Sequence, residues 1–218
     1  MTVTLIGIDH DDLHGYDRLL TLLKRSAPDM IVSENDVKTH KRTLKQRQYI
    51  HNNLASMARV ITEQAPIDVN EKTAKSLLDT YGFEAAAIRD YATANGVGVE
   101  YVGDASHGMM GSFEDDLERR LYQRFFTAPN DELITQSPTS FQAVIDDAYG
   151  DRDVPESVID DLSLRDRDVR YAEELEPYVG SSHEHVVGVF GHNHVYGSYE
   201  ESVGEQLSVA AVRHLGHA

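Results

Sequence analysis

The chain has 218 residues, and 40% of them are hydrophobic, which is sufficient for one domain with a sizeable core. It contains no cysteine, so disulfides, thiol nucleophiles and thiolate metal sites are excluded. The net charge of -17 argues against nucleic acid as a partner, and no apolar stretch reaches the ~18 residues needed for a membrane span.

The makeup of the charge indicates the setting in which the protein works. Lysine is scarce, with 6 residues against 14 arginines, and the 21 aspartates outnumber the 16 glutamates. This composition resembles that of proteins from salt-loving archaea, and it implies strong self-repulsion at low ionic strength. The N-terminus lacks the basic start and long apolar region of a signal peptide. We therefore expect a cytoplasmic protein of a halophilic, archaeal organism.

A strand, a helix and a second strand are expected at residues 3–8, 13–25 and 29–33. The first strand is apolar on both faces, which indicates a central place in the sheet. A strand–helix–strand unit of about 30 residues makes its two strands parallel. Their carboxyl ends then lie side by side, so His10 and Glu34 are expected at one edge of the sheet.

Helices dominate the middle of the chain. Residues 37–64 predict one long helix or a helix pair, followed by helices at 70–79 and 83–94. The long helix contains a basic cluster of Lys38, Lys41, Arg42, Lys45 and Arg47. This cluster is a solvated face of the helix, a lid over the site or a contact for an anionic ligand. A third strand at 97–102 ends just before Asp104.

The rest of the chain predicts helices at 112–126, 141–148 and 155–176 and strands at 186–190 and 207–213. The expected fold is therefore α/β, with a mixed, largely parallel central sheet flanked by helices. A helical insertion follows the second strand, and one domain covers residues 1–218.

Two histidines, His192 and His194, come directly after the buried strand at 186–190. The carboxyl end of such a strand is where open α/β sheets place their sites. The spacing Gly-x-x-His occurs at residues 7–10, 180–183 and 191–194. Only His10 and His194 follow a buried strand, so we interpret these two as functional and His183 as a coincidence.

Two imidazoles and a carboxylate can hold a divalent cation and leave positions open for water and substrate. We expect His10, His194 and Glu34 as ligands, with Glu34 alternatively acting as a general base. His192 is a further ligand or orients the site. Arg167 is expected to neutralise a developing oxyanion. Asp104 is a third polar residue that follows a strand. It either joins the catalytic group or caps the next turn.

Two other chemistries are excluded by missing motifs. The chain has no Gly-rich phosphate loop, so nucleotide binding is not expected. It also has no Gly-x-Ser-x-Gly turn, so serine hydrolysis of that type is not expected.

The ordered set of motifs resembles the TraB/TIKI family, in the wider group of erythromycin esterases and ChaN-like proteins. The first motif is Gly-x-x-His at 7–10, and the second is Pro-Asp at 28–29, followed by a strand and Glu34. A helix and a strand follow at 83–104. The last two motifs are Arg-Asp-x-x-Tyr-Ala at 167–172 and the strand that precedes Gly-x-x-His within 186–197. Two features depart from the family: the C-terminal membrane segment of many archaeal and plasmid-type members is missing, and His192 is additional.

The resemblance implies a mixed α/β fold and the manganese- or cobalt-dependent peptide cleavage of the animal members. Carried over by position, its core residues are His10, Glu34, Arg167 and His194. We therefore expect a metal-dependent hydrolase that uses manganese, cobalt or zinc and acts on a peptide or small-molecule substrate.

Two alternatives stay open. Residues 12–15 (Asp-Leu-His-Gly) and 191–194 (Gly-His-Asn-His) resemble the start and end motifs of calcineurin-like metallophosphoesterases. Asp12, however, lies four residues past the expected strand end, and the middle Gly-Asn-His motif of that family is missing. In the second alternative the same histidines hold a metal, haem iron or a peptide without catalysis.

Overall fold

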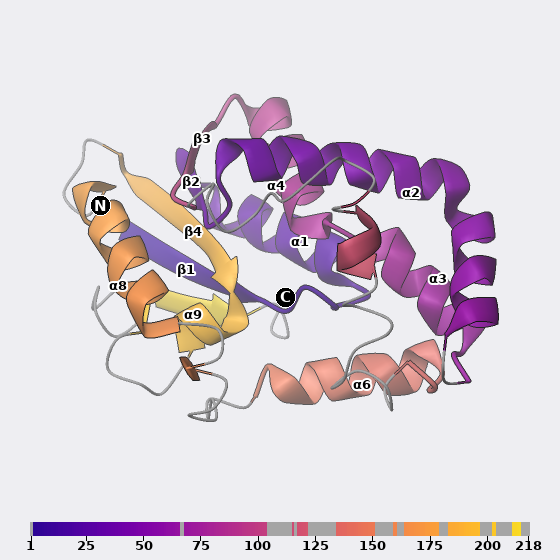
Figure 1. Cartoon of the computed structure of the whole chain (residues 1–218). Helices are drawn as coiled ribbons and strands as arrows, with labels where there is room; N and C mark the ends of the chain where they lie inside the picture. The colour runs from indigo at the N-terminus through magenta and orange to yellow at the C-terminus, as the bar shows by residue number, and fades with distance from the viewer. Residues whose placement is uncertain are drawn as a thin grey trace.

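A five-stranded parallel sheet with the order β3-β2-β4-β1-β5 is the centre of the structure (Figure 1). The computed structural model describes residues 2–65, 68–103, 115, 117–121, 134–150, 159–160, 164–178, 183–196, 202–203 and 211–214. The strands are β1 (Thr2–Ile8), β2 (Met30–Ser33), β3 (Gly98–Tyr101), β4 (His185–Gly191) and β5 (Ala211–His214). All strand pairs among these residues are parallel, which confirms the predicted α/β fold.

Helices pack on both faces of this sheet. On one face the core contains side chains of α1 (Gly15–Ser26), α2 (Val37–Gln64), α3 (Glu71–Thr80), α4 (Phe83–Asn95) and α6 (Pro138–Ala148). On the other face it contains side chains of α8 (Leu164–Leu175) and of the short α9 (His192–Tyr196). A 3-10 turn, η1 (Glu176–Tyr178), follows α8. Figure 1 shows α8 on the opposite side of the molecule from α3.

Strand alternation divides the sheet residues between the two cores. Ile6 and Val189 pack toward the larger helical layer, whereas Leu5 and Phe190 pack toward α8. Each of these side chains is 1% exposed or less. Period-two alternation in strands that are buried on both faces gives the continuous apolar runs seen in the sequence.

Most predicted elements lie within a few residues of the observed ones. The segment 37–64 forms one helix, and its N-cap Asp36 accepts from the backbone N–H groups of Lys38 and Thr39 at 2.7 and 3.1 Å. The expected helix at 112–126 is described only at 115 and 117–121, where it is helical. The expected helix at 155–176 is described at 159–160 and in α8. Among the described residues no helix is long and apolar enough to cross a bilayer.

The strand register sets the position of the residues that follow the strands. Ile8 of β1 lies opposite Gly191 of β4, and Ser33 of β2 lies opposite Val189. β4 therefore lies between β1 and β2, and all three strands end at the same edge of the sheet. The backbone N–H of Glu34 continues the pairing by donating to the carbonyl of Val189 at 3.2 Å.

Candidate functional site

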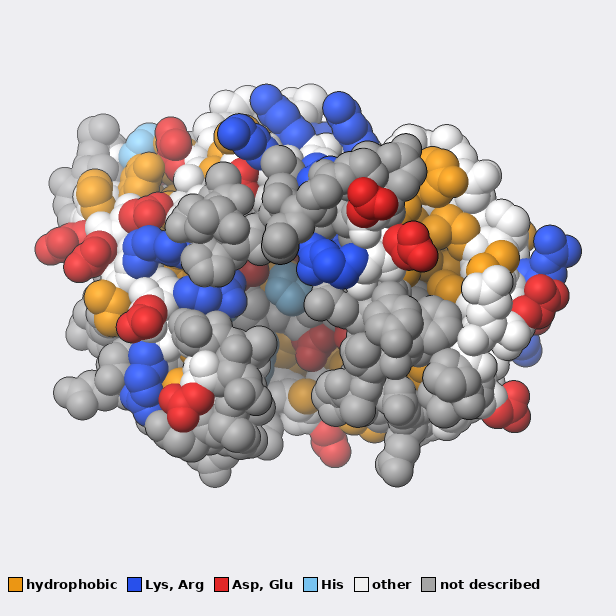
Figure 2. Space-filling view, viewed as in Figure 1, with side chains coloured by type: hydrophobic (Ala, Val, Ile, Leu, Met, Phe, Trp, Pro, Cys, Tyr) orange, Lys and Arg blue, Asp and Glu red, His pale blue; other side chains and the backbone are white. Residues whose placement is uncertain are grey.

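Three predicted residues meet at this edge, beside Gly191. A Cβ atom built on Gly191 would lie 3.3 Å from His194 Cδ2, 3.5 Å from Glu34 Oε2 and 3.6 Å from His10 Nε2. The three side chains come from segments that follow β4, β2 and β1. Figure 2 shows a histidine in a hollow near the middle of the viewed face. The sequence-based expectation that His10, Glu34 and His194 share one edge of the sheet is confirmed.

Glu34 is an ionised carboxylate with one oxygen fixed by the backbone. Its Oε2 accepts from the N–H of Gly191 at 2.5 Å, and its Oε1 lies 3.6 Å from Nε2 of His10. Burial raises the pKa of Glu34, but the hydrogen bond to His10, the charges of His194 and His10, and the Gly191 N–H outweigh burial and lower the pKa to about 2. Oε1 therefore faces the site as a negatively charged acceptor.

His10 lies between two carboxylates. Its Nε2 faces Glu34, and its Nδ1 lies 3.8 Å from Oε1 of Glu84, a residue of α4 whose side chain is 12% exposed. Burial lowers the pKa of His10, but the interactions with Glu34 and Glu84 outweigh it and hold the pKa well above its ordinary value.

His194 is held by a carboxylate of α8, which lies on the same face of the sheet as α9. Its Nδ1 donates a hydrogen bond to Oδ1 of Asp168, and the two residues are 5% and 0% exposed. The edge of the His194 ring packs on Tyr171, with 5.3 Å between ring centroids. With Nδ1 engaged, Nε2 is the nitrogen that remains for a ligand or a proton, and no described residue donates to it or accepts from it.

The two histidines are alike at Nδ1, which in each is directed at a nearly or fully buried carboxylate on a helix, Glu84 or Asp168. They differ at Nε2, which in the half-exposed His10 faces Oε1 of Glu34 and in the buried His194 has no hydrogen bond to a described residue. Histidines that bind metals commonly present one ring nitrogen to the ion while the other donates to a carboxylate. Sequence reasoning did not assign a role to either carboxylate. One signal for Glu84 is that it is the one acid within the apolar run at 83–88.

Arg167 approaches the site from α8. Its Nη2 donates to the Tyr171 hydroxyl at 3.2 Å, and its guanidinium carbon lies 5.8 Å from the centroid of the Tyr171 ring. Burial lowers the pKa of Arg167, but the interaction with Tyr171 and the charges of Glu34 and Asp168 outweigh burial. The pKa of Arg167 therefore lies above its ordinary value. No described carboxylate lies within ion-pair distance of Arg167.

Of the two other predicted residues, the structure describes only His192. Its ring packs on Tyr149, with 5.5 Å between centroids, and its role as a further ligand or orienting residue stays a prediction. Asp104 lies outside the described residues, so its predicted catalytic role stays a prediction.

Asp12 is a buried structural carboxylate. It is 0% exposed and accepts four hydrogen bonds, from the His14 N–H at 2.8 Å, Gln142 Nε2 at 3.0 Å, the Tyr149 hydroxyl at 3.1 Å and Arg18 Nη1 at 3.2 Å. These bonds tie the loop after β1 to α6. They also occupy both oxygens, which leaves no free acceptor for the metal that the phosphoesterase alternative requires at Asp12.

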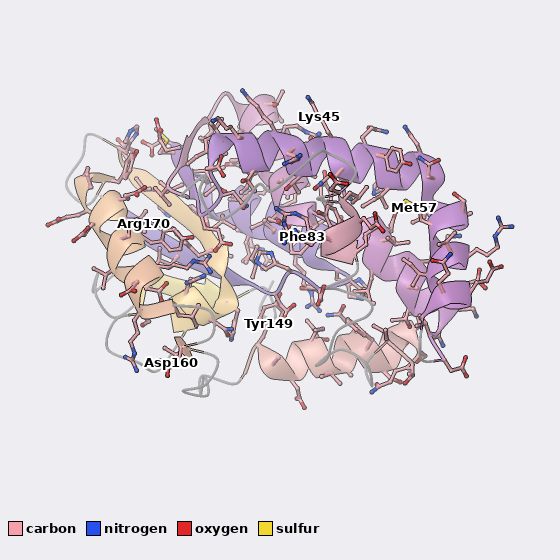
Figure 3. The ribbon with its side chains drawn as sticks, viewed as in Figure 1. Lys45, Met57, Phe83, Tyr149, Asp160 and Arg170 are labelled. Atoms are coloured by element: carbon pink, nitrogen blue, oxygen red, sulfur yellow. The ribbon has the colours of Figure 1, made fainter. Side chains whose placement is uncertain are left out.

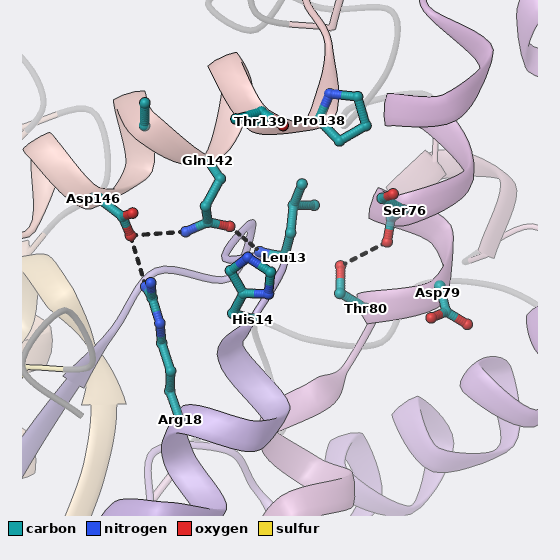
Figure 4. A pocket seen from close by; sticks show the side chains of 11 residues that line it. Leu13, His14, Arg18, Ser76, Asp79, Thr80, Pro138, Thr139, Gln142 and Asp146 are labelled. Carbon is teal, nitrogen blue, oxygen red and sulfur yellow. Dashed lines mark hydrogen bonds and ion pairs between the residues drawn. The ribbon is translucent and has the colours of Figure 1, made fainter.

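A cavity of about 310 Å³ opens beside His10. It is lined by Glu34 and Glu84, by Thr43 of α2, and by Tyr81 and Arg120. A second cavity of about 530 Å³ lies between α1, α3 and α6. There Arg18 and Asp146 form an ion pair at 2.7 Å, and Gln142 accepts from the Leu13 N–H (Figure 4). Its polar side chains are largely engaged with one another, so we place the functional site at the smaller cavity.

The donor set suits a divalent cation in its chemistry. His10, Glu34 and His194 supply two imidazole nitrogens and a carboxylate oxygen, which is a common set for catalytic zinc and related ions. The 3.6 Å between His10 Nε2 and Glu34 Oε1 is close to the separation of two ligands on one ion. In the described part of the chain, however, no three His, Asp or Glu side chains are already arranged around a common ion position.

Comparisons with protein-family models, with curated proteins and with solved structures find no match to this chain.

Proposed function

We propose that this chain is a metal-dependent hydrolase that cleaves peptide bonds at the site formed by His10, Glu34 and His194. The observation that carries the proposal is the convergence of His10, Glu34 and His194 beside Gly191, with Nδ1 of each histidine directed at a nearly or fully buried carboxylate. Glu84 and Asp168 would keep the two rings in the required orientation before any ligand arrives.

His10, Glu34 and His194 would hold the cation, with manganese, cobalt or zinc as the expected ions. Such an ion supplies a water of lowered pKa and polarises the carbonyl of the scissile bond. The resemblance to TraB/TIKI proteins favours a peptide substrate, and the open cavity beside His10 gives an extended chain access to the site.

The side chains of the site have separate parts in this reaction. Glu34 is ionised and keeps Oε2 on the Gly191 N–H, so Oε1 coordinates the ion or accepts a proton from the attacking water. Arg167, fixed on Tyr171, donates to the oxyanion that develops on the substrate carbonyl. The buried Asp168 accepts from Nδ1 of His194 and would keep Nε2 directed at the ion.

The test is a titration of metal-stripped protein with Mn²⁺, Co²⁺ or Zn²⁺, followed by hydrolysis assays in high salt. The substrates are a quenched peptide pool and a generic phosphodiester. His194→Ala should lose both metal binding and peptide cleavage. The matched control is His183→Ala, which has the same Gly-x-x-His spacing but lies just before β4, at the opposite end of that strand.

Three outcomes would count against the proposal. Phosphodiester cleavage in place of peptide cleavage would move the assignment to the phosphoesterase class. Cleavage that survives metal removal would leave His194 and Asp168 as a metal-free acid–base pair. Metal binding without any hydrolysis would indicate a binding protein.

A further inference from the structure

The outer side of α2 carries half of the lysines of the chain. Lys38, Lys41 and Lys45 are exposed, and their spacing of three and four residues places them on one stripe of the helix. Tyr49 continues the stripe one turn later and is 49% exposed. Figure 3 shows Lys45 pointing away from the body of the protein, and Figure 2 shows Lys and Arg side chains gathered along the edge formed by α2.

This stripe has no acidic counterpart on its own helix. α2 contains six basic residues, and its first acidic residue is Glu63, in the last turn. None of the three lysines forms an ion pair with a described residue. The whole chain has a formal net charge of -17, so a basic helix is opposite in sign to the molecule that carries it.

The positions of the lysines do not favour the helix itself. The N-cap Asp36 places one negative charge beside Lys38 and offsets the macrodipole at this end of α2. Lys41 and Lys45 have no acidic residue near them on the helix, and like charges three or four residues apart repel each other. Anionic groups bound along the stripe would remove this repulsion, which is the charge complementarity expected of a docking surface.

We propose that the stripe of Lys38, Lys41, Lys45 and Tyr49 is a docking surface for an acidic polypeptide segment. Lys38 and Lys45 are separated by about 10 Å along the helix axis, a distance that roughly three residues of extended chain cover. An extended segment with alternating acidic residues can therefore meet all three lysines, and the Tyr49 ring offers a rigid amphipathic contact at its end.

A short segment fits the overall charge better than a large anionic surface does. A membrane or a nucleic acid would bring many negative charges against an acidic molecule, and repulsion outside the stripe would oppose binding. A peptide of a few residues meets only the lysines.

The docking surface is separate from the hydrolase site. Thr43 lines the cavity beside His10 and is buried, whereas Lys41 and Lys45 are exposed. The inference therefore does not depend on the proposed function, and it is tested by binding alone.

The experiment measures fluorescence anisotropy of a labelled peptide of alternating glutamate and serine against the full chain at low ionic strength. In the test variant Lys38, Lys41 and Lys45 are all changed to Gln. In the matched control the other three lysines, Lys24, Lys72 and Lys75, which are also exposed, are changed to Gln. Both variants have the same net charge, so they differ only in where the charge was removed.

We expect the test variant to bind the peptide at least about tenfold more weakly than the unmodified chain, and the control to stay within about twofold. Tyr49→Ala should weaken binding in the same direction without a change in charge. Equal losses in the test and control variants would overturn the inference, because binding would then follow net charge alone. No binding by the unmodified chain, or tighter binding to phosphatidylserine vesicles or single-stranded RNA than to the peptide, would also overturn it.

Discussion

Nδ1 of His194 donates a hydrogen bond to a carboxylate of Asp168 that is 0% exposed, and the two residues come from different elements on the same side of the sheet. A buried carboxylate that meets an imidazole fixes both the ring orientation and the nitrogen that carries the proton. This relationship makes α8 a part of the site, although none of its residues follows a strand.

Asp168→Asn should weaken metal binding by about 10- to 100-fold, because an amide holds the His194 ring less firmly and does not raise the basicity of Nε2 as a carboxylate does. The measurement is calorimetric titration of the stripped protein with Mn²⁺. Glu84→Gln should act in the same direction through His10. An unchanged affinity in both variants would show that the two carboxylates only support the fold.

Gly191→Ala should weaken or abolish metal binding and hydrolysis while the fold persists. The added methyl would lie 3.3 to 3.6 Å from atoms of His194, Glu34 and His10, in the space that a ligand between them requires. The control is Gly98→Ala at the start of β3, where the methyl meets only the flexible end of Met30 at 3.1 Å. Thermal unfolding should change little in either variant, so a large loss of stability in Gly191→Ala would contradict a purely local effect.

Asp12→Ala should destabilise the protein by about 3–5 kcal/mol, because Gln142, Tyr149 and Arg18 would lose their shared acceptor in the interior. Urea denaturation measures this free energy of unfolding. Asp12→Asn keeps the shape of the side chain and should cost less. Full stability combined with loss of activity would instead identify Asp12 as a functional ligand, as the phosphoesterase alternative requires.

His40 should make the stability of the protein fall as the pH decreases below about 6.5. Its side chain is 4% exposed and its Nδ1 has no hydrogen-bond partner in the described part of the chain. Burial lowers the pKa of His40, and the charges of Arg89 and Lys41 add to this against an opposite effect of Glu84. The unfolded imidazole therefore takes up a proton at a higher pH than the folded one does.

The test compares the urea unfolding of the natural chain and of His40→Gln at pH 7.5 and pH 5.5, which lie on either side of the unfolded pKa of about 6.5. The difference in unfolding free energy between the two proteins should shift in favour of the variant at the lower pH. Comparison with the variant removes the contribution of His10, whose raised pKa acts in the opposite direction. A difference that is independent of pH would show that His40 is not held neutral by burial.

The parts of the site that follow strands were predictable from the sequence, because strand ends are local features. The short strand–helix–strand unit places His10 and Glu34 at one edge, and the apolar run before Gly191 adds His194. Glu84 and Asp168 belong to helices, and the packing of those helices against the sheet decides which side chains reach the histidines. Asp12 illustrates the opposite case. It belongs to the Asp-Leu-His-Gly motif at 12–15, which resembles a metal-binding motif, but its carboxylate anchors the loop after β1.

Both neighbours of β1 in the sheet come from the last part of the chain. Thr2 lies opposite His185, and Thr4 lies opposite Ala211. During synthesis β1 is therefore made well before either strand that pairs with it, and both of its edges stay unpaired until β4 and β5 have been made. Such distant pairing gives a high contact order and slow folding. His10 and His194 can meet only after β4 has inserted between β1 and β2, so the emergence of function should coincide with the last stage of folding.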